Sequence, residues 1–184
     1  MSGRSKIEIL GRLTVSILAL PLAACAGQEP APATRTHVDI AVVAESGQVT
    51  PVNGLTSSGQ PEEAALRVFA DRGYVAVIDL RGPDEDRGMA DERAAVEALG
   101  LEYVAFPIAS REAINFDTAR ELDAVLQRID GPVLLHCGSG NRVGAMLALR
   151  HSLSGADDDD AITYGKDAGL TGLEGVVRER LAGK

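Results

Sequence analysis

A cysteine and an arginine with glycines between them are the residues most suited to chemistry. In the stretch VLLHCGSGNRVGA, residues 133–145, four residues separate Cys137 from Arg142. The thiolate form of cysteine is a strong nucleophile, and the planar guanidinium of arginine matches two oxygens of a phosphate or sulfate group. Glycines allow successive backbone N–H groups to turn toward a bound anion. The pattern therefore predicts a nucleophilic thiolate beside an oxyanion site.

The residues around this pair are the candidates for holding the anion. The chain between Cys137 and Arg142 offers its backbone N–H groups, and a helix that follows would present its positive end to the same point. Arg81 would either assist the anion or only pair with Asp79, and both interpretations stay open. The predicted substrate-binding set is His136, Gly138, Ser139, Gly140, Asn141, Arg142, Val143 and Arg81.

An alternation of strand and helix patterns positions this loop. Short apolar runs indicate buried strands, and apolar residues along one helical face indicate helices. The expected strands are 49–55, 74–80, 101–106 and 133–137, and the expected helices are 59–73, 91–100, 116–132, 140–153, 157–169 and 171–183.

This order predicts an α/β fold with a central, mainly parallel sheet, helices on both faces and a helical C-terminal third. The loop that begins at Cys137 then follows the carboxyl end of a central strand. In open α/β sheets, ligands bind in the crevice at that edge.

The N-terminus has the layout of an export signal. Basic residues precede a short apolar run, and small residues lead to Cys25 in the sequence LAAC. LAAC resembles the bacterial lipobox, which implies cleavage before Cys25 and lipid attachment to its sulfur; the alternative is an ordinary exported protein. We expect a signal peptide over 1–24, a flexible tether over 25–44 and one domain over 45–184. The protein would be held at the membrane by lipid alone, on the periplasmic side, with the outer membrane favoured because Ala26 is not an aspartate.

Charge and cysteine usage restrict the partners. The formal net charge is −9, with 27 acidic against 18 basic side chains, so nucleic acid is not an expected partner. With Cys25 lipidated, Cys137 is a single free thiol, which indicates reactivity rather than a disulfide. The run DDDD at 157–160 suits the negative first turn of a helix better than a metal site. We therefore expect neither a metal nor a cofactor.

Three segments carry a family resemblance: SGQPEEAALRVFADRGYVAVIDLR, LEYVAFPI and GPVLLHCGSGNRVGA. In order and spacing they resemble the bacterial dual-specificity- and tyrosine-phosphatase-like family of the DUF442 type, which also forms the front domain of beta-lactamase-hydrolase-like proteins. The resemblance covers about residues 48–180. It implies the three-layer cysteine phosphatase fold and hydrolysis of a phosphate monoester, on a small molecule or a phosphoprotein. Cys137 would form a phosphocysteine intermediate, Arg142 would clamp the phosphate, and His136 would hold the loop.

The sequence departs from that family in two places. These phosphatases need a carboxylic acid to protonate the leaving oxygen, yet the loop after LEYVAF has no aspartate at the usual place. Glu85 and Asp86, and then Glu112, are the candidate acids. Val143 stands where a hydroxyl residue usually assists release of the thiolate, so we expect slow breakdown of the phosphocysteine.

Two other functions stay open. The four-residue spacing before Arg142 is also that of rhodanese sulfurtransferases, which would carry a persulfide on Cys137. The GHIPGA element of rhodaneses is absent after IDLRGPDEDRG, which favours the phosphatase. The remaining alternative is a catalytically weak module that binds phosphate or another oxyanion.

Overall fold

The computed structural model describes residues 35–184. The predicted signal peptide over 1–24, the lipidation site Cys25 and the first part of the predicted tether lie outside the described residues. Within the described chain, no helix combines the length and the apolar character that crossing a membrane requires.

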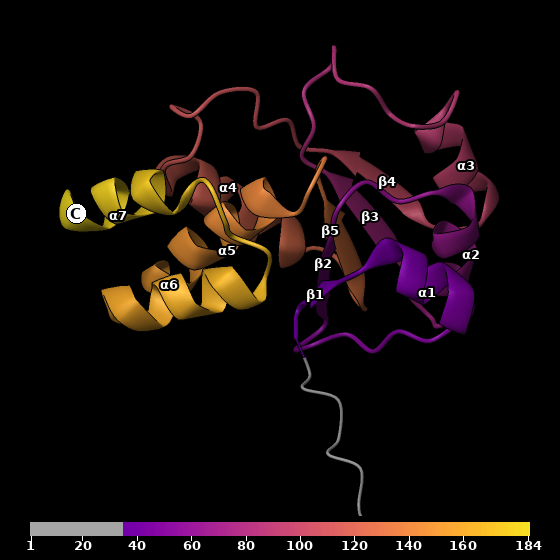
Figure 1. Cartoon of the computed structure of the whole chain (residues 1–184), viewed down its shortest axis with the longest axis horizontal. Coiled ribbons are helices and arrows are strands. Elements are labelled where there is room, and N and C mark those ends of the chain that lie inside the picture. Colours follow the sequence, from indigo (N-terminus) through magenta and orange to yellow (C-terminus); the bar gives the residue numbers. More distant parts are fainter. Residues whose placement is uncertain (1–34) are drawn as a thin grey trace, which may run out of the picture. The chain divides into compact units, whose positions relative to one another are not determined.

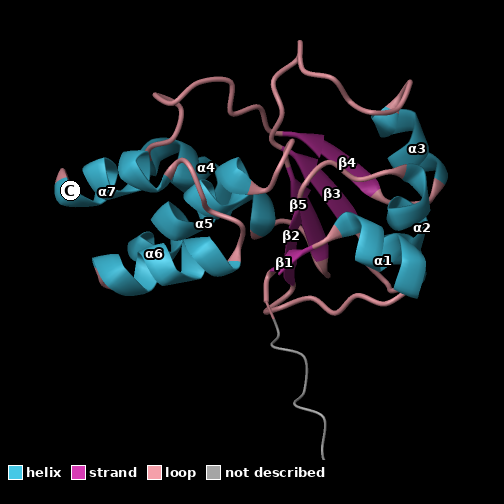
Figure 2. Ribbon diagram, viewed as in Figure 1, coloured by secondary structure: helices cyan, strands magenta, loops and turns pink. Residues whose placement is uncertain are grey.

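Five strands form one parallel sheet in the order β1-β2-β5-β3-β4 (Figures 1 and 2). Every position of β2, β3 and β5 is buried, as expected for parallel strands covered on both faces. The central strand β5 lies between β2 and β3, so that His136 at its end is level with Ser58 and Asp79. The strands are β1 (His37–Val38), β2 (Leu55–Ser58), β3 (Ala76–Asp79), β4 (Glu102–Ala105) and β5 (Val133–His136).

Helices cover both faces of the sheet. One face packs against α1 (Ile40–Ser46), α2 (Glu63–Asp71) and α3 (Glu92–Ala98), around a core that includes Phe69 and Leu134. The other face packs against α4 (Phe116–Leu126), α5 (Asn141–Leu153), α6 (Asp158–Asp167) and α7 (Glu174–Ala182), around a core that includes Ile78 and Leu135. These helices form the two outer layers in Figure 1. The predicted α/β fold, with its helical C-terminal third, is confirmed.

Helix α5 is the centre of the second face. It is buried along most of its length, and Gly144 lets it approach α6 closely, because a β-carbon there would lie 2.6 Å from the carbonyl oxygen of Gly165. The run of aspartates is accommodated as expected: Asp157 caps α6 by accepting the N–H of Asp160, and the following aspartates occupy the first turn. The buried position of α5 fixes the loop that precedes it.

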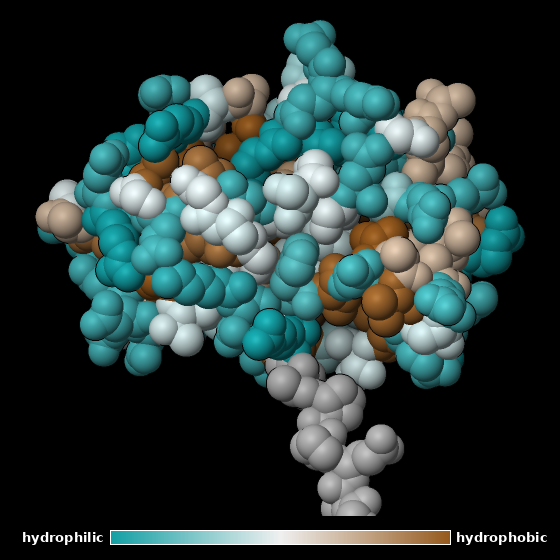
Figure 3. Space-filling model, in the orientation of Figure 1, coloured by the Kyte–Doolittle hydropathy of each residue, from teal (hydrophilic) through white to brown (hydrophobic). Residues whose placement is uncertain are grey.

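The N-terminal part of the fold differs from the prediction. The strand expected over 49–55 is instead β2, which begins at Leu55, because Asn53 and Gly54 have positive φ angles and form a turn. Residues 37–46 form β1 and α1, so ordered structure begins before the predicted domain start at residue 45. Apolar side chains gather on the face over α1 (Figure 3), where Val42 is 58% exposed.

Candidate active site

The loop between β5 and α5 forms a tight turn around the sulfur of Cys137. Cys137 directly follows the last residue of β5, and α5 begins at Asn141. Gly140 has a φ of 83°, which favours glycine, and its N–H donates to Sγ of Cys137 at 3.1 Å. The thiol therefore lies at the positive end of α5, at the carboxyl edge of the sheet.

Arg142 in the first turn of α5 reaches across this edge. Its Nη2 donates to Oε2 of Glu85 at 2.6 Å, and its Nη1 donates to Oε1 of the same carboxylate. Nη1 also donates to the carbonyl oxygens of Leu80 and Ile108, at 3.4 and 3.3 Å. Contacts with two other loops, those after β3 and after β4, thus fix the direction of the guanidinium.

Glu85 and Arg142 stabilise each other as an ion pair. The N–H of Gly82 donates to Oε1 of Glu85 at 2.6 Å, which orients the carboxylate. The hydrogen bonds from Arg142 lower the pKa of Glu85. Glu85, with a smaller contribution from the neighbouring Cys137, raises the pKa of Arg142. In this arrangement Glu85 is an ionised partner of the arginine.

A buried network of charges lies directly behind the loop. Arg81 donates to both carboxylate oxygens of Asp79, at 2.9 and 3.0 Å, and to Glu92. Arg87 and the hydroxyl of Tyr103 also donate to Asp79, the latter at 2.8 Å. Burial alone would raise the pKa of Asp79, but these hydrogen bonds outweigh it and lower the pKa to about 2. The structure pairs Arg81 with Asp79 and buries its side chain, and a role of Arg81 in binding the anion stays a prediction.

His136 lies against this network as a neutral imidazole, and neither of its ring nitrogens has a hydrogen-bond partner among the described residues. Its Nε2 lies 3.0 Å from Oε1 of Glu92 and 3.8 Å from Oδ1 of Asp79. Complete burial lowers the pKa of His136 to about 3, against the opposing attraction of Asp79. Arg81 and Arg87 already balance the two carboxylates, so a proton on the imidazole would leave an uncompensated buried charge.

The same residues have the types of a metal site, and Oε1 of Glu92 and both ring nitrogens of His136 have no hydrogen-bond partner in the described part of the chain. Ligand atoms of Asp79, Glu92 and His136 lie within 4.8 Å of one another. However, Arg81 donates to both carboxylates and Arg87 to one of them. Two fixed positive charges at these oxygens disfavour a cation, so we assign the cluster as an ion-pair network.

Two cavities open on either side of Ser139. One, of about 270 Å³, is lined by Ile108, Ala109, Ser110, Arg111, Ile114, Ser139, Asn141, Arg142 and Leu173. The other, of about 420 Å³, is lined by His37, Val38, Asp39, Ile40, Gly59, Gln60, Gly138 and Ser139. Residues of the thiol loop thus line two open spaces, whereas Cys137 itself is buried and lines neither of them.

The structure places the other predicted residues as follows. Asp86 is exposed and accepts the N–H of Gly88, and Glu112 is exposed in the loop after β4. Neither lines the two cavities. The side chain of Val143 is buried in the core, and Oδ1 of Asn141 accepts the N–H of Thr171 at 2.8 Å. The structure therefore brings together Cys137, its loop, Arg142 and Glu85, and leaves the general acid a prediction.

His37 is a neighbour of the loop that the sequence did not indicate. A β-carbon on Gly140 would collide with Cε1 of His37, and one on Gly169 would lie 2.7 Å from Nδ1. Nδ1 also lies 3.2 Å from Oγ of Ser57. Burial lowers the pKa of His37. The imidazole is therefore packed against the turn that holds the thiol, a contact that only the position of β1 in the sheet could predict.

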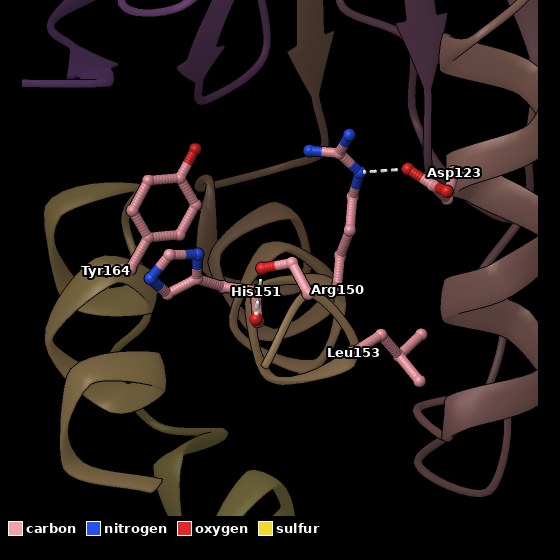
Figure 4. A pocket seen from close by; sticks show the side chains of 6 residues that line it. Asp123, Arg150, His151, Leu153 and Tyr164 are labelled. Atoms are coloured by element: carbon pink, nitrogen blue, oxygen red, sulfur yellow. Dashed lines mark hydrogen bonds and ion pairs between the residues drawn. The ribbon is translucent and has the colours of Figure 1, made fainter. Parts of the chain in front are cut away.

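A further cavity lies away from Cys137. It has a volume of about 160 Å³ and is lined by residues of α4, α5 and α6 and by Ser154, which directly follows α5 (Figure 4). Arg150 donates to Asp123 at 2.7 Å, and the rings of His151 and Tyr164 stack with centroids 4.5 Å apart. No residue of the thiol loop lines this cavity, so it is separate from the candidate site.

Comparison with known proteins identifies the family to which this chain is similar. The family model described as DSP-PTPase phosphatase fused to NAD+ kinase matches residues 41–166. The beta-lactamase hydrolase-like protein of Xylella fastidiosa is 32% identical over 111 residues, 59% of this chain and 26% of that protein. Its counterpart from Agrobacterium fabrum is 28% identical over 120 residues, 63% of this chain and 28% of that one. The chain thus spans about a quarter of the length of these curated relatives.

Solved structures share the fold at lower identity. A candidate phosphatase from Neisseria meningitidis Z2491 has a TM-score of 0.60 at 21% identity, covering 70% of this chain and 92% of that one. Tk-PTP in its active form has a TM-score of 0.52 at 22% identity, covering 70% and 90%. At these identities, the comparison shows that this chain shares the fold of these two proteins.

Proposed function

The chain belongs to the family of DSP-PTPase phosphatases fused to NAD+ kinase, and from this premise we propose that it hydrolyses phosphate monoesters with Cys137 as the nucleophile. The observation that carries the proposal is the contact between the Gly140 N–H and Sγ of Cys137, with Arg142 on the same rim. Backbone donors at a helix N-terminus and a guanidinium are suited to hold the oxygens of a phosphate in front of the sulfur.

The proposed reaction has two steps. In the first, the thiolate of Cys137 attacks phosphorus, a P–S bond forms, and the P–O bond to the leaving group breaks as that oxygen takes a proton. In the second, water attacks phosphorus and the P–S bond breaks, which releases inorganic phosphate and restores the thiolate. Arg142 and the loop N–H groups stabilise the charge on the phosphate oxygens in both steps.

We assign Glu85 the role of positioning Arg142. Its lowered pKa and its two hydrogen bonds to the guanidinium support an ionised carboxylate that orients the arginine rather than donating a proton. Asp86 and Glu112 stay candidates for the proton donor. The buried valine side chain of Val143 offers no hydroxyl, so we expect hydrolysis of the phosphocysteine to limit turnover.

The test is hydrolysis of phenyl phosphate by the full chain under reducing conditions. We expect turnover that vanadate blocks, a burst of phenol in the first turnover, and loss of activity in Cys137→Ser. Because the chain has two cysteines, Cys25→Ser is the matched control and should keep the activity of the wild type.

Two results would contradict the proposal. One is the absence of turnover in the wild type with a free thiol. The other is retention of activity in Cys137→Ser. Thiocyanate production from thiosulfate and cyanide, with a mass gain of one sulfur on Cys137, would instead support sulfurtransfer.

We also propose that the protein is exported and anchored by lipid at Cys25, on the periplasmic side. The sequence LAAC after an apolar run supports this. In a bacterial host, the wild type should fractionate with membranes and incorporate labelled fatty acid, and Cys25→Ser should do neither. Equal fractionation of the two proteins would contradict the lipid anchor.

A further inference from the structure

The cavity beside Arg142 has one apolar side and a second cationic group. Ile108, Ile114 and Leu173 supply the apolar side, and Arg111 lines the same cavity as Arg142. With a volume of about 270 Å³, the space exceeds what a phosphate alone would need. Because Arg142 lines this cavity, it can receive the body of a small ester whose phosphate Arg142 holds.

Arg111 is unusual among the arginines near the site. Arg81, Arg87 and Arg142 all pair with carboxylates, whereas Arg111 forms no ion pair within the described residues 35–184. The adjacent Glu112 forms no ion pair with Arg111 in that range, and the attraction of Arg111 contributes less to the lowered pKa of Glu112 than the hydrogen bond from Ser110. Arg111 therefore holds a charge that is available to a ligand.

The loop that carries Arg111 is held at several points. The N–H of Ile108 donates to the Leu80 carbonyl at 3.0 Å, and the N–H of Ile114 donates to the Arg111 carbonyl at 3.2 Å. From α7, Nε of Arg180 donates to the Ile114 carbonyl at 2.9 Å. A fixed backbone reduces the entropy that binding must overcome.

We propose that this cavity is a subsite for a second anionic group, so that the preferred substrate is a small phosphate ester that also carries a carboxylate or a second phosphate. Arg111 binds the second anion, and the apolar side accommodates the spacer between the two groups. The inference rests on the proposed phosphatase function, because it assumes that the first phosphate lies at Cys137 and Arg142.

The experiment compares phenyl phosphate with 3-carboxyphenyl and 4-carboxyphenyl phosphate, which present a second anion at two spacings. For the wild type and Arg111→Ala, kcat/KM is measured for each ester. We expect the substitution to reduce kcat/KM for at least one carboxyphenyl ester about tenfold more than for phenyl phosphate, the low end of what a hydrogen bond to a charged group contributes. Comparing variants on the same ester cancels differences in leaving-group reactivity.

The matched control is Arg128→Ala. Arg128 is exposed, forms no ion pair within residues 35–184 and does not line the cavity, so its removal changes the net charge equally. A selective loss in Arg111→Ala that Arg128→Ala does not reproduce supports the subsite. Equal losses on all three esters, or the same selectivity in the control, would overturn it.

Binding separates this inference from the proposed function. Calorimetry measures the affinities for the same esters without turnover. It compares the Cys137→Ser variant with the double variant that also carries Arg111→Ala. A carboxylate preference that depends on Arg111, without turnover by the wild type, would contradict the phosphatase and support the subsite. Turnover without any such preference in either assay would contradict the subsite alone.

Discussion

The neutral state of His136 can be tested through the pH dependence of stability. The change is His136→Gln, which removes the titrating group from the buried network and keeps an uncharged polar side chain. In the unfolded chain the imidazole has a pKa of 6.5, and in the fold burial lowers its pKa to about 3. Acid therefore protonates the unfolded state first, and the free energy of unfolding falls as the pH drops below 6.5.

The two pKa values set the size of the effect. The full difference corresponds to roughly 5 kcal/mol of unfolding free energy, lost between about pH 6.5 and pH 3. Between pH 7 and pH 5, the expected loss is roughly 2 kcal/mol, because only the unfolded state takes up the proton there. Asp79 adds little in this interval, since its pKa of 3.8 falls to about 2 in the fold and its stabilisation is lost below 3.8.

Urea unfolding followed by far-ultraviolet circular dichroism, at pH 7 and pH 5 and constant ionic strength, measures this loss. The wild type should lose roughly 2 kcal/mol more than His136→Gln. As a control, His37→Gln retains His136 and should retain its contribution. The alternative is that the carboxylates of Asp79 and Glu92 keep His136 protonated in the fold. In that case the wild type would gain stability relative to the variant at pH 5. That result, or equal slopes, would refute charge balance by Arg81 and Arg87.

Three other substitutions test separate parts of the structure. Glu85→Gln should lower kcat/KM for phenyl phosphate roughly tenfold at every pH from 5 to 8, because Arg142 loses the partner that orients it; loss of the alkaline side of the profile alone would identify Glu85 as the proton donor. Gly144→Ala should destabilise the fold by roughly 2–3 kcal/mol in urea unfolding, because the added methyl meets the backbone next to α6. Gly175→Ala, with open space around it, should instead be neutral or stabilising by up to about 1 kcal/mol, and equal effects would contradict the packing argument. Tyr103→Phe removes one hydrogen bond to a buried carboxylate and should cost about 1–2 kcal/mol in the same assay; an unchanged midpoint would show that this bond adds nothing.

The sequence predicts the layers of this fold and the position of its thiol loop well, for local reasons. Buried strands such as β3 and β5 are short apolar runs, and Gly140 marks a turn that needs a positive φ. The order of elements then places Cys137 at the carboxyl edge of the sheet. The strands and the glycine turn depend on residues that are neighbours in the chain, and a single sequence shows these neighbours directly.

The features that a single sequence hides depend on distant contacts. Strand β1 has two residues and is held by pairing with β2, so its pattern is too short to detect. The partners of Arg81 include Glu92, eleven positions away on another element. Glu85 is close to Arg142 only because the loop after β3 folds over the sheet edge. Its type suggested an acid catalyst, whereas its contacts support a positioning role.

The packing of His37 against Gly140 bears on how this domain should be produced for study. A recombinant fragment that starts at residue 45, where the sequence suggests that the domain begins, would lack β1, most of α1 and the imidazole that supports the turn around the thiol. Such a fragment would expose the edge of β2 to solvent. Its activity would be measured on a thiol loop that lacks the support of His37. A fragment that begins before Arg35 retains both the thiol loop and His37, which supports it.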